Sequence, residues 1–285
     1  MNSPYEFPPY SIFKPRDNKF EEVKVGPFNN DYIGGEKTYV YSLIIPAYNE
    51  ENRIGPFLDH LKENLSSVWE IIVVCDGNDR TAEIAKSHGK RFNVLEFKSK
   101  LGKGGAIIEG FRRASGNVIG YVDADGALSS KEILKVFSRV DLKTPVAIAS
   151  RWIRGSQILT KQPMIRIILG RIYHYVTFAT LGITAKDTQC GLKAYDAEVL
   201  MDVMKRLKLM NMSIDTAILY HLKLLGYEIV EVPVTWRDVE GSKFSPFKTS
   251  LTMFATLVGL RLIHKTKSKI LKEKLSLIYD LMDNI

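Results

Sequence analysis

Cysteine is scarce in this chain of 285 residues, with only Cys75 and Cys190 present. Their spacing matches no metal-ligand pattern, so we expect two reduced, buried thiols, as in an intracellular protein. The chain also has no internal repeat and no Walker A loop, the phosphate-binding motif of many nucleotide-hydrolysing enzymes.

Long uncharged apolar runs are absent too, so we expect no transmembrane helix. The first 16 residues are proline-rich and polar and contain no apolar segment of the kind found in signal peptides. Residues 164–183 come nearest to a membrane segment, but Arg166, Arg171 and His174 lie on one side of the predicted helix. Such a broad-faced amphipathic helix can be buried in a core or lie in a membrane interface. The sequence alone supports the two placements equally.

Apolar residues make up 45% of the chain and charged residues 25%, as in a globular protein with a substantial core. Lys and Arg number 40 against 32 Asp and Glu, an excess that suits either anionic partners or simple solubility. Basic residues are concentrated in 261–274. No aromatic platform or recognition motif accompanies them, so we expect no nucleic acid partner.

Strand and helix patterns alternate from residue 39 onward, which predicts an α/β fold with a mostly parallel sheet covered by helices on both faces. Expected strands are 41–46, 70–75, 93–97, 118–122, 146–150 and 228–236. Expected helices are 54–65, 81–88, 104–114, 129–140, 164–183, 197–207, 214–225, 251–263 and 270–282. We divide the chain into an extended N-terminal arm with little regular structure (1–39), a catalytic domain (40–247) and an apolar and basic helical segment (248–285).

The most informative motif is Asp123-Ala124-Asp125, which directly follows the apolar run 118–122. Two carboxylates at the end of a buried strand are unfavourable unless a cation lies between them. A hard divalent ion with a nucleoside diphosphate is the usual solution, although a surface turn with two acids is the competing interpretation. Ligands of such sheets bind beyond the carboxyl ends of the strands, where Pro46, Asp76 and Asp123 are expected.

Further residues fit a phosphate or nucleotide site. Asp76 could accept hydrogen bonds from a base or ribose, although an Asp before a glycine is also common in turns. The Gly-Lys-Gly-Gly segment at 102–105 precedes an expected helix, and its Lys103 adds a positive charge. Arginine forks bind phosphate bidentately, although a single arginine is by default a solvated surface residue. The cationic candidates are Arg151, Arg154, Arg166, Arg171, Arg237 and Lys243.

These motifs, in this order, resemble those of the family-2 glycosyltransferases with a GT-A fold. Within that family the chain is most similar to the dolichyl-phosphate β-glucosyltransferases, with the dolichyl-phosphate mannose synthases as cousins. The resemblance covers about residues 41–264. The motifs that match the general donor half of the family are Pro46-Ala47-Tyr48-Asn49-Glu50, Asp76-Gly77, Gly102-Lys103-Gly104-Gly105 and Asp123-Ala124-Asp125-Gly126-Ala127. Two motifs are more specific to the glucosyltransferase group: Asp187-Thr188-Gln189-Cys190-Gly191 and Glu240-Gly241-Ser242-Lys243.

The resemblance implies a Rossmann-like GT-A sheet, C-terminal amphipathic interfacial helices, and roles for individual residues. The nucleotide sugar would be bound by Pro46, Tyr48, Glu50, Asp76, Lys103 and Asp123. Asp123 and Asp125 would hold Mg²⁺ or Mn²⁺. The acceptor phosphate would be bound by Arg151, Arg166, Arg237 and Lys243. The catalytic group would comprise Asp125, Arg151 and Asp215.

The sequence departs from the family pattern in three places. Ala127 stands where the mannose synthases have a glutamine metal ligand, so the metal needs another ligand or water. Asp215-Thr216-Ala217 replaces the Asp-x-Glu of the glucosyl group, which removes the second carboxylate. An N-terminal membrane anchor, common among the relatives, is replaced by a proline-rich arm.

The sequence therefore predicts an inverting, metal-dependent transfer of a hexose, with UDP-glucose as the favoured donor, to a polyprenyl (dolichyl) phosphate. We expect a peripheral, monotopic protein on the cytoplasmic face of a membrane. One alternative is a family-2 enzyme that uses GDP-mannose or a soluble acceptor. Another, of a different class, is a non-catalytic protein that binds a nucleotide sugar or a lipid phosphate.

Overall fold

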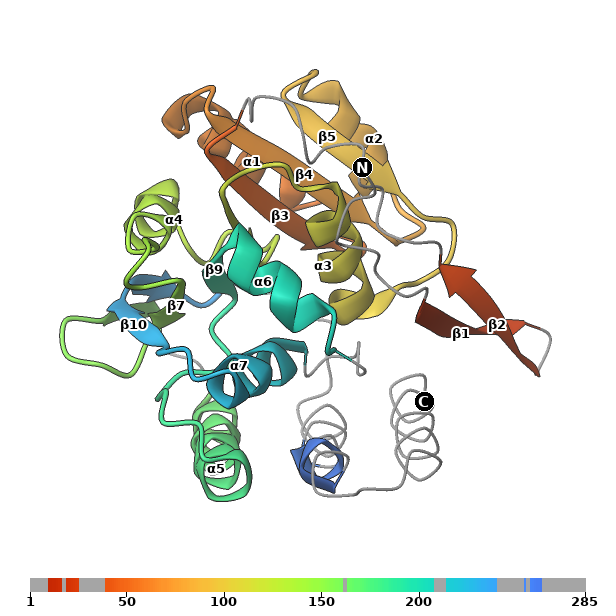
Figure 1. Ribbon diagram of the computed structural model, residues 1–285. Coiled ribbons are helices and arrows are strands. Elements are labelled where there is room, and N and C mark those ends of the chain that lie inside the picture. The colour runs from red at the N-terminus through yellow and green to blue at the C-terminus, as the bar shows by residue number, and fades with distance from the viewer. Residues whose placement is uncertain are drawn as a thin grey trace, which may run out of the picture.

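A seven-stranded sheet forms the centre of the molecule, with strand order β10-β7-β9-β6-β3-β4-β5 (Figure 1). The computed structural model describes residues 10–16, 19–25, 39–160, 163–207, 214–239, 254 and 257–262. The strands of the sheet are β3 (Tyr41–Ala47), β4 (Trp69–Cys75), β5 (Phe92–Glu96), β6 (Val118–Val122), β7 (Val146–Ser150), β9 (Leu192–Asp196) and β10 (Val230–Pro233). All the ladders are parallel except those of β9, so the expected mostly parallel sheet is confirmed.

Strand β9 was not expected, and it joins the two halves of the sheet. It runs antiparallel between β6 and β7, with Leu192 opposite Val122. Its sequence contains Lys193 and Asp196, which obscure the apolar pattern of a central strand. Because β9 runs against β6, the loop that precedes it arrives at the edge where β6 ends. That loop is 187–191, the motif typical of the glucosyl group.

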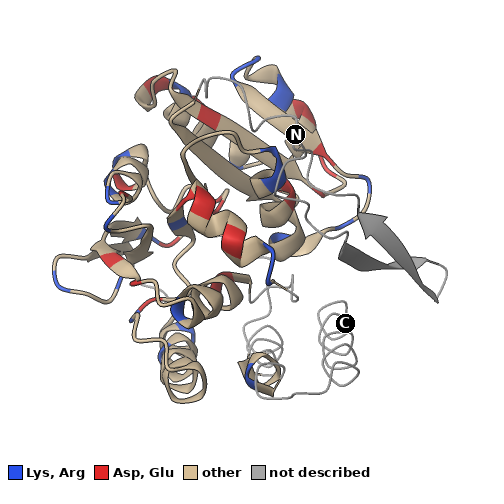
Figure 2. Ribbon diagram, in the orientation of Figure 1, with Lys and Arg blue, Asp and Glu red and all other residues tan. Residues whose placement is uncertain are grey.

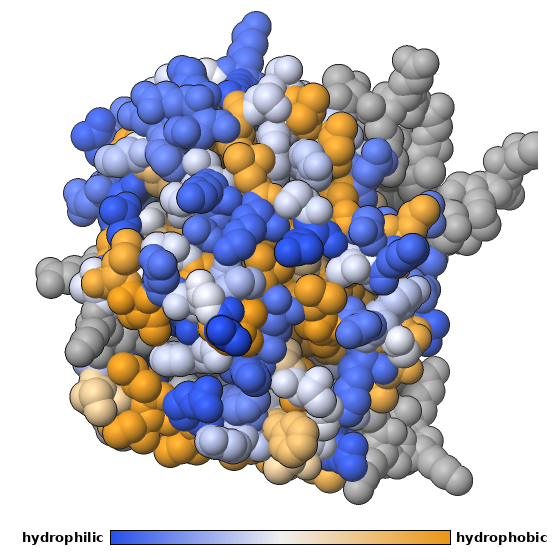
Figure 3. Space-filling view, turned by 90° about the vertical axis from the view of Figure 1, so that its left-hand side faces the viewer, coloured by the Kyte–Doolittle hydropathy of each residue, from blue (hydrophilic) through white to orange (hydrophobic). Residues whose placement is uncertain are grey.

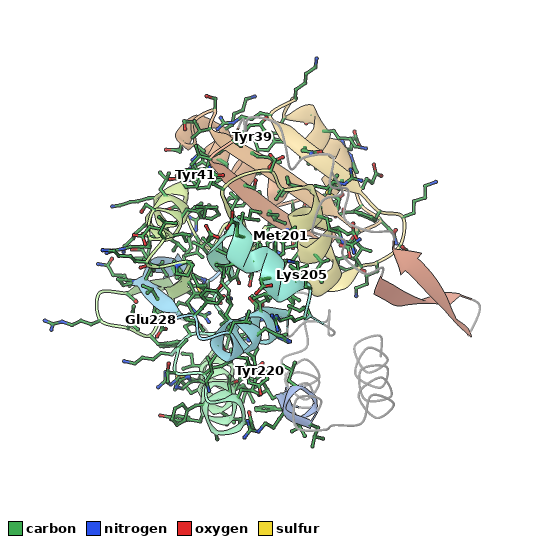
Figure 4. All side chains as sticks on the ribbon, in the orientation of Figure 1. Tyr39, Tyr41, Met201, Lys205, Tyr220 and Glu228 are labelled. Atoms are coloured by element: carbon green, nitrogen blue, oxygen red, sulfur yellow. The ribbon has the colours of Figure 1, made fainter. Side chains whose placement is uncertain are left out.

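Helices cover both faces of the sheet, as predicted. One face packs against α1 (Ile54–Asn64), α2 (Thr81–Ser87) and α4 (Ser130–Phe137), and the other against α3 (Gly102–Arg113), α6 (Ala197–Met204) and α7 (Ile214–Leu224). Figure 4 marks the second face with Met201 on α6 and Tyr220 on α7. The two layers bury the aliphatic side chains of β3 and β4 almost completely, which fixes the sheet edge where these strands end.

Several local expectations were wrong. The expected N-terminal arm contains an antiparallel hairpin, β1 (Tyr10–Arg16) with β2 (Lys19–Val25). The signal for it was the pair Asp17-Asn18, residue types that favour hairpin turns. The expected strand 228–236 is divided into β10 and β11 (Thr235–Arg237), and β11 pairs with an unexpected strand, β8 (Gln157–Thr160).

Two helix starts also differ from expectation. The expected capping box of α4 is not formed: Ser129 is the N-cap without a side-chain cap bond, and the Ser130 N–H donates to His60 instead. The Gly-Lys-Gly-Gly segment forms the first turn of α3 rather than a loop before it. The domain boundaries at 39 and 247 stay predictions. The helix 270–282 and Lys243 lie outside the described residues, and of 251–263 only 254 and 257–262 are described, all helical.

The amphipathic helix expected over 163–183 is α5 (Met164–Leu181), and it carries its apolar side outward. Its polar side chains face the protein: Arg166, Arg171 and His174 are half-buried, and Thr177 is buried. Among the described residues, the outward face is a stripe of exposed apolar side chains, formed by Met164, Ile165, Ile168, Ile172, Tyr175 and Phe178. The outer face of α5 is therefore not buried in the core.

The surface around α5 agrees with this orientation. The helix carries two arginines and no acidic residue, whereas α6 carries acidic side chains (Figure 2). In the space-filling view, hydrophobic side chains gather along the lower edge of the molecule, the end at which α5 lies in Figure 1 (Figure 3). No helix in the described part of the chain is long and apolar enough to cross a membrane.

Candidate active site

Asp123 follows the carboxyl end of β6, where it contacts the loop that precedes β9. Its N–H donates to the Gly191 carbonyl oxygen at 2.9 Å. Gly191 leaves the space that the Asp123 side chain fills, since a Cβ at position 191 would lie 2.0 Å from Asp123 Oδ2. The sequence pattern had placed Gly191 in a group-specific motif. The structure shows what this glycine does locally, which is to permit a close approach of the carboxylate.

Asp125 lies two residues further on and is more enclosed. Its Oδ1 accepts the Ala127 N–H at 3.0 Å. Burial and the neighbouring carboxylate of Asp123 raise the pKa of Asp125, because both disfavour its ionised form. Arg53 is close enough to offset part of this charge, but it is also paired with Glu50 at 2.6 Å. Asp125 is therefore the member of the aspartate pair that is short of positive charge.

The donor set of this pair fits a hard divalent cation. Carboxylate oxygens are the ligands that Mg²⁺ prefers, and Mg²⁺ is often held by one or two carboxylates together with substrate phosphates. Within the described residues no group of three His, Cys, Asp or Glu side chains could hold a metal ion. A metal ion held by these two aspartates would need further ligands, such as diphosphate or water oxygens.

Lys103, in the first turn of α3, connects Asp123 to Asp215. Its Nζ lies 2.9 Å from Asp123 Oδ1 and 3.4 Å from Asp215 Oδ2. Burial opposes the charge of Lys103, but the two carboxylates raise its pKa above the ordinary value. Asp215, on α7, is buried and also accepts hydrogen bonds from Lys193 and Tyr121. Although burial raises the pKa of Asp215, its cationic partners lower it to about 2.

The residues expected around the nucleoside lie along the same edge. Asp76 Oδ2 accepts the N–H groups of Leu101 and Gly102 at 2.7 and 2.8 Å and so fixes the start of α3. Burial raises the pKa of Asp76 in spite of these bonds. The Lys100 ammonium lies 4.6 Å from the ring centroid of Tyr48. Pro46 is the penultimate residue of β3.

Arg151 directly follows β7 and forms an ion pair inside the protein. Its Nε and Nη2 donate to the two carboxylate oxygens of Asp187 at 2.7 and 2.9 Å. Burial opposes the charge of Asp187, but the guanidinium lowers its pKa below the ordinary value. The pairing ties β7 to the 187–191 loop. Contact of Arg151 with an acceptor phosphate stays a prediction, as does a direct catalytic role for Asp215.

Arg237 lies beside the turn that follows Asp125, and Arg166 lies beside Asp238. Their contact with an acceptor phosphate stays a prediction. The Arg237 N–H donates to the Ala127 carbonyl oxygen at 3.2 Å. Together with Asp125 and Arg53, Arg237 lines a cleft of about 520 Å³, whose wall also includes Phe57 and Leu159. The Arg166 guanidinium lies 3.9 Å from the carboxylate of Asp238, the residue that follows Arg237 in the chain.

Two features of this edge are not predicted from the sequence: the burial of Lys193, which lies in the unexpected strand β9, and the pairing of Asp187 with Arg151. The 187–191 motif is a sequence signal for the loop itself. No local signal predicted Lys193, since a lysine in a short polar segment is ordinarily solvent-exposed.

Comparison with known proteins places these features in a family. Residues 42–204 match the family model described as Glycosyl transferase family 2. The dolichyl-phosphate beta-glucosyltransferase of Saccharomyces cerevisiae is 31% identical, over 87% of this chain and 82% of the yeast protein. The protein of that name from Dictyostelium discoideum is 32% identical, over 82% of this chain and 75% of its own length.

Solved structures support the fold. A glucosyl-3-phosphoglycerate synthase from Mycobacterium tuberculosis, in complex with Mn²⁺, UDP-glucose and phosphoglyceric acid, superposes with a TM-score of 0.59. It is 17% identical, and the match covers 79% of each chain. A second structure of that enzyme, with Mg²⁺ and UDP, has a TM-score of 0.57 at 16% identity and covers 79% of this chain and 78% of its own. The expected GT-A-like fold is confirmed.

We predict that Gly191→Ala will displace the Asp123 carboxylate, because the added methyl group overlaps it. We expect a loss of about 1–3 kcal/mol in the free energy of unfolding, typical of overpacking, measured by urea denaturation. Gly170→Ala is the matched control, because a Cβ at this position on α5 meets no atom within 4 Å. It should leave stability unchanged or raise it by up to about 1 kcal/mol. Equal effects of the two substitutions would contradict the close approach at Gly191.

Proposed function

The chain belongs to glycosyl transferase family 2, and on this basis we propose that it transfers glucose from UDP-glucose to a polyprenyl phosphate of the dolichyl type. The observation that carries the proposal is the Asp123–Asp125 pair at the end of β6, in which Lys103 balances Asp123 but Asp125 is short of positive charge. Helix α5, with its stripe of exposed apolar side chains, supports a lipid acceptor. The names of the curated relatives and the ligands of the structural neighbours support the same donor and acceptor.

In this proposal Asp123 and Asp125 hold Mg²⁺ or Mn²⁺ against the donor diphosphate. The bound ion would supply neutralisation of the negative charge that develops on the leaving UDP. The residues of the chain fix the geometry: Gly191 and Lys103 position Asp123, and the Ala127 N–H positions Asp125. Asp76 fixes the start of α3. Tyr48, Glu50 and Pro46, at the same edge of the sheet, would contact the nucleoside.

The acceptor in this proposal is a phosphate monoester, which is already ionised at neutral pH because its second pKa is about 6. No general base is therefore needed to generate the nucleophile. Arg237 and Arg166 would reduce repulsion between the acceptor and the donor diphosphate. Arg151, held in place by its ion pair with Asp187, would add a further positive charge for the acceptor phosphate. In-line attack inverts the anomeric carbon and gives a β-linked product from an α-linked donor.

The orientation of α5 supports a lipid acceptor over a soluble one. A helix that turns its arginines inward and its isoleucines outward is unfavourable in water, because it exposes a contiguous apolar face. The same arrangement is favourable at a bilayer surface, where the apolar stripe enters the acyl boundary and the polar side faces the site. We propose that the protein is peripheral to the membrane; its placement on the cytoplasmic face remains part of this proposal.

A donor and acceptor panel tests the function directly. Radiolabelled UDP-glucose and GDP-mannose are each incubated with dolichyl phosphate, with and without EDTA. We expect a lipid-linked product from UDP-glucose that disappears with EDTA and returns with added Mn²⁺ or Mg²⁺. Product from GDP-mannose alone, or transfer only to a water-soluble acceptor, would contradict the proposal. Binding of UDP-glucose without any turnover would indicate a non-catalytic binding protein.

We predict that Asp125→Ala reduces transfer at least about 100-fold, comparable to the loss of one charge-stabilising group. Folding should be retained within about 1 kcal/mol, because the substitution removes a carboxylate whose ionised form is disfavoured in the fold. Asp202→Ala, at a half-exposed position on α6, serves as the control and should leave transfer unchanged. Near-normal turnover of Asp125→Ala would refute its role as a metal ligand.

We also predict that Ile168→Glu weakens flotation with liposomes that contain phosphatidylglycerol by about tenfold. The substitution places a charged group where an exposed apolar side chain of α5 would enter the bilayer. Leu142→Glu is the matched control: this leucine is 99% exposed and belongs to the segment between α4 and β7, not to α5. It should float like the wild type. If neither wild type nor variant binds liposomes, the stripe on α5 does not contact a bilayer.

A further inference from the structure

Four side chains of alternating charge run from the core to the candidate active site. Lys193 is fully buried, and its Nζ lies 2.5 Å from Asp215 Oδ1. Asp215 Oδ2 is 3.4 Å from Lys103, and Lys103 is 2.9 Å from Asp123. The side-chain exposures along this series are 0%, 2%, 18% and 38%. The series therefore opens toward the site at its Asp123 end.

The inner part of the series is satisfied without Lys103. Asp215 accepts hydrogen bonds from the Lys193 ammonium and the Tyr121 hydroxyl. Lys193 also donates to the Cys190 carbonyl oxygen at 2.8 Å, which ties it to the loop below Asp123. A buried carboxylate with these partners keeps its place if a third partner moves. The inner cluster of Asp215, Lys193 and Tyr121 is therefore complete without Lys103.

At the exposed end of this series, Lys103 would compete with a metal ion for the Asp123 carboxylate. A divalent cation that binds Asp123 must weaken the Lys103–Asp123 ion pair, because both cations need the same carboxylate. A bare ion would gain Asp123 and Asp125 but would leave the Lys103 ammonium with one fewer partner. When the ion arrives together with a diphosphate, a phosphate oxygen can take the place of Asp123 as the partner of Lys103. Asp215 keeps the ammonium beside the site during this exchange.

We propose that Lys103 is an internal counter-ion that weakens the binding of a bare divalent cation to the aspartate pair and makes metal and nucleotide bind together. Asp215 and Lys193 are the positioning residues that hold Lys103 in reach of the diphosphate. This inference rests on the proposed function, because it assumes that a metal–diphosphate complex binds at Asp123. It adds an order of binding that the chemistry of transfer alone does not require.

The test compares wild type with Lys103→Met, which removes the charge and keeps an unbranched side chain. Bound Mn²⁺ is measured in the full-length protein by loss of the free-ion signal in electron paramagnetic resonance, with and without UDP. We expect Lys103→Met to bind Mn²⁺ alone about tenfold more tightly, and UDP in the presence of Mn²⁺ about tenfold more weakly, the size of one charge-assisted hydrogen bond. A purely structural lysine would not move the two affinities in opposite directions.

Two control variants sharpen the test. Lys103→Arg keeps the positive charge and should bind Mn²⁺ alone as weakly as wild type. Lys100→Met removes a nearby lysine that lies over the Tyr48 ring, and it should leave the affinity for Mn²⁺ alone unchanged. A gain in Mn²⁺ affinity with Lys100→Met as large as that with Lys103→Met would show a general effect of charge and would overturn the proposal.

The remaining outcomes separate this inference from the proposed function. If wild type binds no UDP with Mn²⁺, the proposed function fails, and the inference fails with it. If wild type binds UDP with Mn²⁺ but Lys103→Met leaves the Mn²⁺ affinity unchanged, only the inference fails. A Lys103→Met protein that does not fold would show Lys103 to be structural and would also overturn it. Wild type supplies an independent check, since Mn²⁺ affinity that does not rise when UDP is present contradicts coupled binding.

Discussion

Two carboxylates at one edge of a sheet repel each other, and the arrangement of this site follows from how that repulsion is offset. Asp123 is balanced by Lys103, whereas Asp125 is shielded only in part by Arg53, which is shared with Glu50. The protein thus balances one aspartate internally and leaves the other short of positive charge. Such partial compensation keeps the pair in place while retaining an attraction for a cation.

The antiparallel strand β9 makes this compensation possible. It brings Lys193 into the core beneath the site and delivers the 187–191 loop to the end of β6. The loop then acts through several contacts at once, since Asp187 pairs with Arg151 and Gly191 seats Asp123. A motif that looks like a surface loop in the linear sequence here packs under the aspartates and holds Asp123 in place. Its residues contact other parts of the protein more than they face solvent.

Helix α5 connects the chemistry of this edge with its surroundings. Arg166 lies beside Asp238, and Asp238 follows Arg237 at the wall of the cleft. The opposite side of the same helix is the exposed apolar stripe. One helix therefore places Arg166 beside the residue that follows Arg237 and carries apolar side chains on its exposed face. An acceptor with an ionic head and a hydrocarbon chain would be matched by both sides together.

The sequence by itself determined the alternation of strands and helices and the placement of Asp76 and Asp123 at strand ends. Apolar period and turn residues are local signals, and a parallel sheet brings its carboxyl ends to one edge. The sequence did not determine β9, the pairing of Arg151 with Asp187, or the burial of Lys193 and Asp215. Each depends on partners distant in the chain, and a charged residue reads as solvent-exposed until its partner is known. The outward face of α5 was likewise decided only by tertiary structure, because amphipathic periodicity defines two sides of a helix but not which one faces the protein.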